Sequence, residues 1–298
     1  MVPYDTAEPR FVGYGMIHSR KTRSLREMDG EGLPIVPTLH LEPQTHLCLD
    51  GLPYVPAWVA KMPLYVRVCF DAVGYPHSFF RICERNQLEA VIIDLLSLAK
   101  SETSSVCDIT VQPHLRERLG GAVALLDHVL VIETVDGNAR GLLREGYVNQ
   151  RFLLYSSSRR RDVTGTQKKA IYWNGESYAH RVAVRLTWED INILSKFRYS
   201  ARMLYEYCIL EDGTPIFLEK KPLPDGSFTF DVGRGMFVVW PSNDLAEGKK
   251  RRYRIPSLEL ATELTPRLLH EFSGGAFFSH LAFYAATNKI PMRFTNVE

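Results

Sequence analysis

The sequence predicts an α+β protein built from antiparallel sheets with a few packed helices. Residues 85–100 carry apolar side chains at the i, i+3, i+4, i+7 spacing of one helix face. These side chains are Leu88, Val91, Ile92, Leu95, Leu96 and Ala99. Much of the remaining chain consists of short alternating apolar runs that end at turn sequences such as Asp212-Gly213 and Asp225-Gly226. A clear amphipathic helix among many short strands is typical of a mixed α+β fold.

In the first half of the chain, alternation predicts four strands in addition to this helix. They cover residues 64–70, 106–111, 128–135 and 151–155. Asp136-Gly137 follows the third strand and has the composition of a hairpin turn. The polar segment 156–169 comes next and is expected to be a loop that separates two halves of the protein.

The second half is expected to run from a strand through a helix into a β-meander. Residues 181–186 alternate as a strand. Thr187 then stands as the N-cap of a helix over residues 188–198, with Asp190 three positions later in a capping box of the Asp form. Further strands are expected over residues 204–210, 215–219, 227–231 and 236–240.

The two ends of the chain differ from its middle. Residues 1–63 are rich in proline and glycine, which favours a proline-rich arm of short strands and ordered loop. In the last 50 residues, Thr265-Pro266 predicts a helix through residue 272, and a second apolar helix is expected over residues 276–287. The expected organisation is an arm over 1–63, an α+β domain over 64–155, a half-domain over 156–248, and a basic linker with C-terminal helices over 249–298.

Composition excludes several classes of protein. Lys+Arg 36 against Asp+Glu 34 leaves a net charge of +2, so any binding of polyanions must come from local patches. The five cysteines are widely spaced, which fits reduced thiols rather than a disulfide framework or a paired zinc site. The sequence shows no signal peptide and no apolar stretch of membrane-spanning length. We therefore expect an intracellular protein, nuclear or cytoplasmic, with no membrane partner.

Known catalytic and cofactor motifs are absent from the sequence. Gly13-Tyr-Gly15 and Gly233-Arg-Gly235 each lack the third glycine of a dinucleotide-binding turn, and there is no phosphate-binding P-loop or nucleophile elbow. His46 and Cys48 would share one face of a strand, but no second cluster supplies the four ligands of a zinc site. We expect no catalytic residues, cofactor or metal, although an active site assembled from distant residues remains an alternative.

Two basic runs are candidates for contact with nucleic acid. The first is Arg159-Arg160-Arg161 with Lys168-Lys169, in the expected loop. The second is Lys249–Arg254, in which Tyr253 offers a stacking face. A solvated surface is the alternative for both runs, and a nuclear-localisation sequence is a further one for the second.

Residues 182–239 resemble the closing half-domain of DNA sliding clamps, with the greatest likeness to the checkpoint clamp. The likeness rests on the order of an apolar strand at Val182–Leu186, a helix, a strand, a turn with a small residue and proline, and a further strand at Ile216–Glu219. It implies a non-enzymatic subunit of a DNA damage checkpoint or replication ring that slides on phosphates without reading bases. Four cations of the half-domain would then face double-stranded DNA; these are Arg185, Lys196, Arg198 and Arg202. The run Arg159–Arg161 would contact the phosphates together with them.

A second interpretation is a structural or assembly subunit of a viral or other large complex, and a third is an enzyme with a dispersed site. The aromatic C-terminal segment favours a multimeric assembly, because large aromatic side chains dominate interface energetics. Its candidate partner contacts are Phe277, Phe278, Leu281, Phe283 and Tyr284. We expect homo- or hetero-oligomeric protein partners on this basis.

Overall fold

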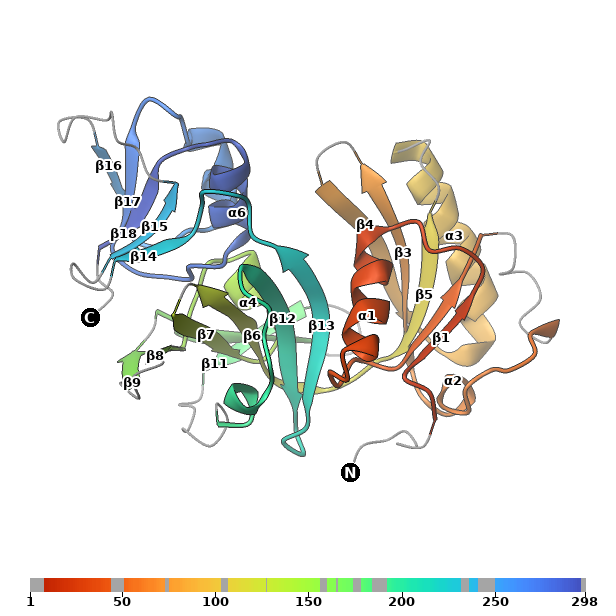
Figure 1. Ribbon diagram of the computed structural model, residues 1–298. Coiled ribbons are helices and arrows are strands. Elements are labelled where there is room, and N and C mark those ends of the chain that lie inside the picture. Colours follow the sequence, from red (N-terminus) through yellow and green to blue (C-terminus); the bar gives the residue numbers. More distant parts are fainter. Residues whose placement is uncertain are drawn as a thin grey trace. The chain divides into compact units, whose positions relative to one another are not determined.

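The computed structural model confirms a fold that combines several β-sheets with few helices (Figure 1). It describes residues 8–43, 51–72, 75–102, 107–126, 128–155, 160–164, 166–173, 178–183, 192–231, 236–240 and 250–295. The chain forms two compact units. The first contains residues up to Arg116 together with Ile216–Lys220, and the second contains Glu117–Pro215 and Lys221 onward.

The first unit is a five-stranded sheet with a helix on each face. The strand order is β1-β2-β5-β3-β4, in which β1 and β2 run parallel and the other neighbours are antiparallel. The helix α3 (Leu88–Glu102) covers one face, and α1 (Arg20–Gly30) lies on the other (Figure 1). The strands are β1 (Phe11–Tyr14), β2 (Thr38–Leu41), β3 (Leu64–Ala72), β4 (Tyr75–Cys83) and β5 (Asp108–Pro113).

The predicted helix over 85–100 and strand over 64–70 are both confirmed. Gln87 ends a 3-10 turn, η2 (Arg85–Gln87), that leads into α3. Leu88, Ile92, Leu95 and Ala99 of α3 are buried against the apolar side chains of β3. The first 63 residues, expected as an arm, supply β1, α1, the short helix α2 (Trp58–Lys61) and β2, so two of the five strands of this sheet come from them.

The second unit contains three sheets. The largest has the order β13-β12-β6-β7-β8-β9, and the smallest is the pair β10 and β11. Strands β7, β8 and β12 match the predicted strands over 128–135, 151–155 and 204–210, whereas β6 was not predicted. The strands are β6 (Glu117–Leu126), β7 (Val129–Asp136), β8 (Gln150–Tyr155), β9 (Arg160–Thr164), β10 (Lys169–Trp173), β11 (Tyr178–Val182), β12 (Met203–Leu210) and β13 (Pro215–Pro222).

Asp136-Gly137 does not form the predicted two-residue hairpin. Gly137 has a φ of +83°, and an added Cβ would lie 2.3 Å from the carbonyl oxygen of Ile171, so this position requires glycine. The chain then forms the short helix α4 (Arg140–Leu143) before it enters β8.

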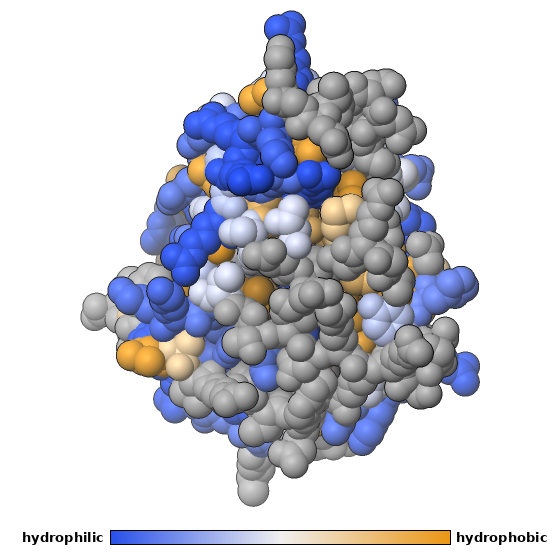
Figure 2. Space-filling model, turned by 90° about the vertical axis from the view of Figure 1, so that its left-hand side faces the viewer, coloured by the Kyte–Doolittle hydropathy of each residue, from blue (hydrophilic) through white to orange (hydrophobic). Residues whose placement is uncertain are grey.

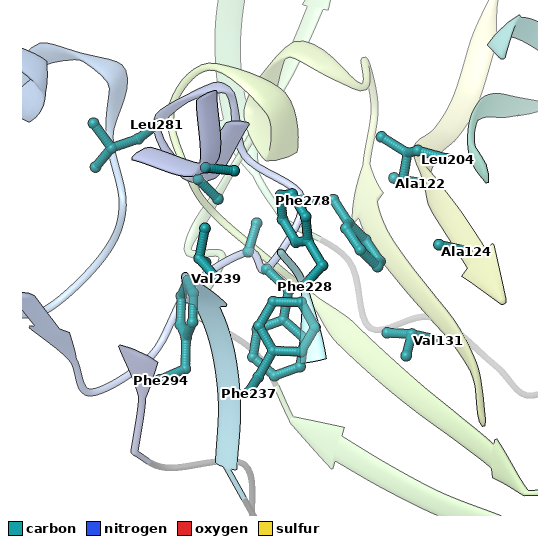
Figure 3. Packing of buried hydrophobic residues seen from close by; sticks show 14 of the residues in the cluster. Ala122, Ala124, Val131, Leu204, Phe228, Phe237, Val239, Phe278, Leu281 and Phe294 are labelled. Carbon is teal, nitrogen blue, oxygen red and sulfur yellow. The ribbon is translucent and has the colours of Figure 1, made fainter. Parts of the chain in front are cut away.

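The C-terminal sheet has the order β14-β15-β18-β17-β16 and one helix, α6 (His280–Thr287). Its inner face joins α6 and the largest sheet in one core (Figure 3). In this core Phe237 stacks on Phe277 with ring centroids 4.0 Å apart. The strands are β14 (Thr229–Asp231), β15 (Met236–Trp240), β16 (Lys250–Tyr253), β17 (Leu269–Phe272) and β18 (Met292–Phe294).

The predicted helix over residues 265–272 is wrong, because Leu269–Phe272 is the strand β17. A 3-10 helix, η4 (Leu258–Glu263), precedes it. Strand β17 lies between β16 and β18 and pairs in parallel with both, so its backbone groups bond on each side. The tertiary ladder therefore overrides the local helix signal of Thr265-Pro266. The second predicted helix is confirmed from His280 onward, as α6.

The aromatic C-terminal segment belongs to the core of this chain. Phe277, Phe278 and Leu281 are each 0% exposed, and Phe283 and Tyr284 pack against the same core from its edge. This corrects the expectation that the segment bridges to another subunit, because the three buried side chains present no surface to a partner. Association with other proteins stays a prediction that these residues do not support.

Ser279 caps α6, and we expect Ser279→Ala to lower the free energy of unfolding by about 1 kcal/mol. Its hydroxyl accepts a hydrogen bond from the backbone N–H of Ala282 at 3.2 Å in a fully buried position. Ser257 provides the control, because it stands at the N-cap of η4 and makes no side-chain capping bond. Urea denaturation should show a clear loss of unfolding free energy for Ser279→Ala. For Ser257→Ala the loss of unfolding free energy should not exceed about 0.5 kcal/mol. Equal losses would contradict the assigned role of the cap.

Candidate functional site

The sheet of the first unit has one apolar face and one polar face. The apolar face packs on α3. Register places Arg67 of β3 opposite Phe80 of β4 and Thr110 of β5, so these side chains share the other face. Buried polar side chains fill most of the rest of this face; they are Thr38, His40, Asp108, Thr110 and Gln112. Because buried polar groups need hydrogen-bond partners, the partners of these side chains show whether the chain satisfies the face by itself.

Arg67 is the most informative residue on this face. Its terminal nitrogen donates to the hydroxyl of Tyr65 at 3.1 Å. Its Nε is buried and has no hydrogen-bond partner among the described residues. A guanidinium keeps its charge in proteins and carries donors in a fork that matches phosphate or carboxylate oxygens. A buried donor without a partner is costly, so the free Nε–H indicates a place for an acceptor that the described residues do not supply.

Lys21 and Glu219 accompany Arg67. The Nζ of Lys21, on α1, lies 3.0 Å from Oε2 of Glu219, on β13, and both side chains are largely buried. Burial by itself lowers the pKa of Arg67, but Tyr65, Cys69 and Glu219 outweigh this effect and raise it. Two cations, Arg67 and Lys21, and two carboxylates, Glu219 and Asp108, therefore act on Cys69 from nearby. Their charges balance, so the unpaired Nε–H is the feature that distinguishes Arg67.

Aromatic side chains extend the polar face toward solvent. The ring of Tyr65 stacks on that of Phe80, with centroids 5.0 Å apart, and Phe80 is 37% exposed. The guanidinium of Arg67 lies over the Tyr65 ring at 5.1 Å. An exposed aromatic surface next to cations suits a ligand with a planar ring at one end and an anionic group at the other.

The N-terminus of α1 is fixed on this face by Asp108. The carboxylate accepts hydrogen bonds from the backbone N–H groups of His18 and Ser19 and lies 3.3 Å from Nε2 of His40. Burial raises the pKa of Asp108, but the hydrogen bonds from His40, His18 and Ser19 outweigh it and hold the pKa below its usual range. An ionised carboxylate at a helix N-terminus is favourable, and it positions Lys21, two residues into the helix.

Cys69 lies on the same face but has no sign of reactivity. Burial raises the pKa of its thiol, and the nearby Arg67 and Lys21 offset this only in part. A neutral, buried thiol is a poor nucleophile.

No group of three or more His, Cys, Asp or Glu side chains placed to hold a metal ion occurs in the described part of the chain. None of the helices described there has the length and apolarity of a transmembrane segment. Glu219 is a single carboxylate, which suits a Mg²⁺ ion only when substrate phosphates complete its ligands.

The structure describes five of the seven predicted nucleic-acid contacts. Arg159 and Arg185 lie outside the described residues, and Arg160 and Arg161 are in β9, which pairs with β8, rather than in a loop. Lys196 and Arg198 are exposed. Arg202 donates to the carbonyl oxygens of Pro224 and Ser227, so it holds the loop before β14.

The predicted helix over 188–198 falls largely on residues outside the description. Thr187 and its proposed cap are among them. The described end of this segment is a 3-10 turn, η3 (Leu194–Lys196), and the chain is already extended at Phe197, with φ −81° and ψ 154°. The helix therefore does not continue to Arg198.

Comparison with known proteins gives matches among solved structures only. No family model matches the chain, and no curated protein matches it. D-cycloserine synthetase DcsG is similar at 13% identity and a TM-score of 0.36, over 68% of this chain and 62% of that one. The D-Ala:D-Ser ligase VanG of Enterococcus faecalis is similar at 11% identity and a TM-score of 0.37, over 69% of this chain and 52% of that one.

A further match is N5-carboxyaminoimidazole synthase of Aspergillus clavatus, solved with ADP and 5-aminoimidazole ribonucleotide. It is 12% identical with a TM-score of 0.36, over 68% of this chain and 43% of that one. This chain thus spans less than two thirds of each of these proteins. Likeness at this level does not define the fold or the activity of the chain.

The sliding-clamp prediction is wrong, and so are the DNA-binding, DNA-repair and non-enzymatic assignments that followed from it. The solved structures named above are ligases and synthetases, and none of them is a clamp. Strand order in the described residues agrees: β12 and β13 belong to the sheet that contains β6, and β14 and β15 belong to the C-terminal sheet. The strands of the segment 182–239 are therefore divided between sheets and do not form one half-domain. Apolar alternation, on which the resemblance rested, is common to all of them.

Proposed function

We propose that this protein is an enzyme that binds a nucleoside triphosphate on the polar face of its first unit and consumes it in a ligase-type reaction. The observation that carries the proposal is Arg67, whose buried Nε–H lacks a partner among the described residues and stands near Lys21 and Glu219. The phosphates would accept hydrogen bonds from Arg67 and Lys21. Glu219 would share a Mg²⁺ ion with them.

The rest of the face supports the nucleoside end of the same ligand. The stacked rings of Tyr65 and Phe80 offer a partly exposed aromatic surface beside the guanidinium. Stacking of a base on an aromatic side chain contributes roughly 1–3 kcal/mol and requires no particular base. A cation pair and an aromatic surface on one sheet face therefore match the two ends of a nucleotide.

Binding of MgATP and MgADP, measured by isothermal titration calorimetry, tests the proposal. We expect Arg67→Gln to weaken binding by about 10- to 100-fold, because a hydrogen bond to a charged group contributes about 1.5–3 kcal/mol. Arg67→Lys keeps the charge without the fork and should give an intermediate loss.

Arg81→Gln is the matched control. Arg81 lies on β4 of the same sheet, one position along from Phe80, but on the opposite face, where it pairs with Asp94 at 2.7 Å. Its replacement should leave nucleotide affinity unchanged. A wild-type protein that binds neither nucleotide would overturn the proposal, as would equal losses in Arg67→Gln and Arg81→Gln.

A further inference from the structure

The outer face of the C-terminal sheet carries a charged cluster that the proposed nucleotide site does not include. Strands β16, β17 and β18 run parallel, and the register places Arg252, Glu271 and Arg293 directly across from one another. Lys250 lies two residues before Arg252 and therefore on the same face. Figure 2, viewed from the side of these strands, shows strongly hydrophilic residues gathered in its upper part.

All three cations of this cluster converge on one carboxylate. The Nε of Arg293 lies 2.8 Å from Oε1 of Glu271, the Nε of Arg252 lies 3.2 Å from Oε2, and the Nζ of Lys250 lies 3.4 Å from Oε2. Burial raises the pKa of Glu271, but Arg293, Arg252 and Lys250 outweigh it and lower the pKa, so the carboxylate is ionised at neutral pH. Three positive charges and one negative charge leave a local excess of +2.

This excess is not needed to satisfy Glu271. Elsewhere in the same unit a carboxylate is matched by one guanidinium: Glu133 pairs with Arg151, and Glu263 pairs with Arg251. The cations here also remain available to solvent, because the side chain of Arg252 is 74% exposed and that of Lys250 is 36% exposed, whereas that of Glu271 is 7% exposed. Like charges held together on a sheet face repel one another unless an anion joins them.

We propose that this face binds a phosphate-bearing small molecule through its dianionic phosphate group. A dianion balances the excess of +2, and the guanidinium groups of Arg252, 74% exposed, and Arg293, 26% exposed, match phosphate oxygens from either side of Glu271. The geometry argues against recognition of a nucleic acid base here. Tyr253, the expected stacking residue, points to the opposite face and stacks on Phe272 at 5.0 Å in the core.

Inorganic phosphate is the probe, and its binding is measured by calorimetry at low ionic strength. We expect saturable binding in the millimolar range or tighter, weakened about tenfold by Arg252→Gln because a charge-assisted hydrogen bond is lost. Lys250→Gln should weaken it less, because lysine acts as a point charge without a fork. Glu271→Gln should strengthen binding, because the competing carboxylate charge is removed.

Arg251→Gln supplies the control for this test. Arg251 is adjacent to Arg252 on β16 and just as charged, but it lies on the opposite face, where it pairs with Glu263 at 2.8 Å. Any phosphate bound at Arg67 contributes equally to both variants, so their difference reports on the C-terminal sheet alone. The proposal is overturned if wild-type protein shows no saturable phosphate binding, or if Arg251→Gln weakens it as much as Arg252→Gln.

Discussion

Glu133→Ala is expected to lower the free energy of unfolding by about 3–5 kcal/mol, because it leaves a buried arginine without its counter-charge. Glu133 and Arg151 face each other across β7 and β8, with side chains 0% and 3% exposed. The Nε of Arg151 donates to Oε1 of Glu133 at 2.7 Å. Burial lowers the pKa of Arg151, and the Glu133 carboxylate offsets that effect only in part, so the arginine depends on its counter-charge.

The carboxylate also joins two parts of the second unit. Its oxygens accept the backbone N–H groups of Phe277 and Phe278 at 2.9 and 3.1 Å, so the large sheet and the segment before α6 meet at this one side chain. Arg151 contributes on the same side, since it donates to the carbonyl oxygen of Gly275. Removal of Glu133 therefore leaves two backbone donors and one cation unpaired in a dry environment.

Urea denaturation with matched variants checks this prediction. Glu263→Ala breaks the exposed pair with Arg251, whose side chains are 53% and 40% exposed, and should cost less than about 1 kcal/mol. The double variant Glu133→Gln with Arg151→Met removes both charges and keeps a side-chain oxygen that can accept from the backbone N–H groups. It should lose less unfolding free energy than Glu133→Ala alone. A loss for Glu133→Ala no larger than that for Glu263→Ala would contradict the assigned role.

The sequence predicts local elements well where one face of the element is apolar. The helix over 85–100 and the strand over 64–70 are confirmed because their apolar periodicity coincides with the face that packs. Strand β6 escapes prediction because it is buried on both faces, so its side chains do not alternate. Strand β17 escapes prediction because its parallel pairing with β16 and β18, and not its own sequence, fixes its extended conformation.

The candidate site was not predictable from motifs, since its residues come from three separate segments. Arg67 stands at an alternate position within the apolar run Tyr65–Phe70, and a charged residue there is the one local signal. That signal does not reveal which face of the strand is polar. Lys21 and Glu219 join Arg67 only through the packing of α1 and β13. The same holds for the C-terminal cluster, in which Glu271 and Arg293 meet Arg252 through parallel pairing.

Phe277→Ala is expected to cost about 3–5 kcal/mol of unfolding free energy, the usual loss when a buried phenylalanine is truncated. The ring of Phe277 is 0% exposed and lies nearly parallel to that of Phe237, at an interplanar angle of 4°. The guanidinium carbon of Arg151 lies 3.3 Å from the centroid of the Phe277 ring. The ring of Phe294 packs edge-on against that of Phe277, with centroids 4.9 Å apart. Truncation removes all three contacts and leaves a cavity in the core.

Phe283→Ala is the matched control, because Phe283 belongs to the same segment but is only partly buried at the edge of the core. It should cost clearly less than Phe277→Ala in the same urea titration. The dependence on protein concentration separates a core role from an interface role. If Phe277 stabilises this chain from within, the midpoint of unfolding of wild type and variant stays constant over a hundredfold range of concentration. A midpoint that rises with concentration in the wild type and not in Phe277→Ala would instead show that the ring is buried between subunits.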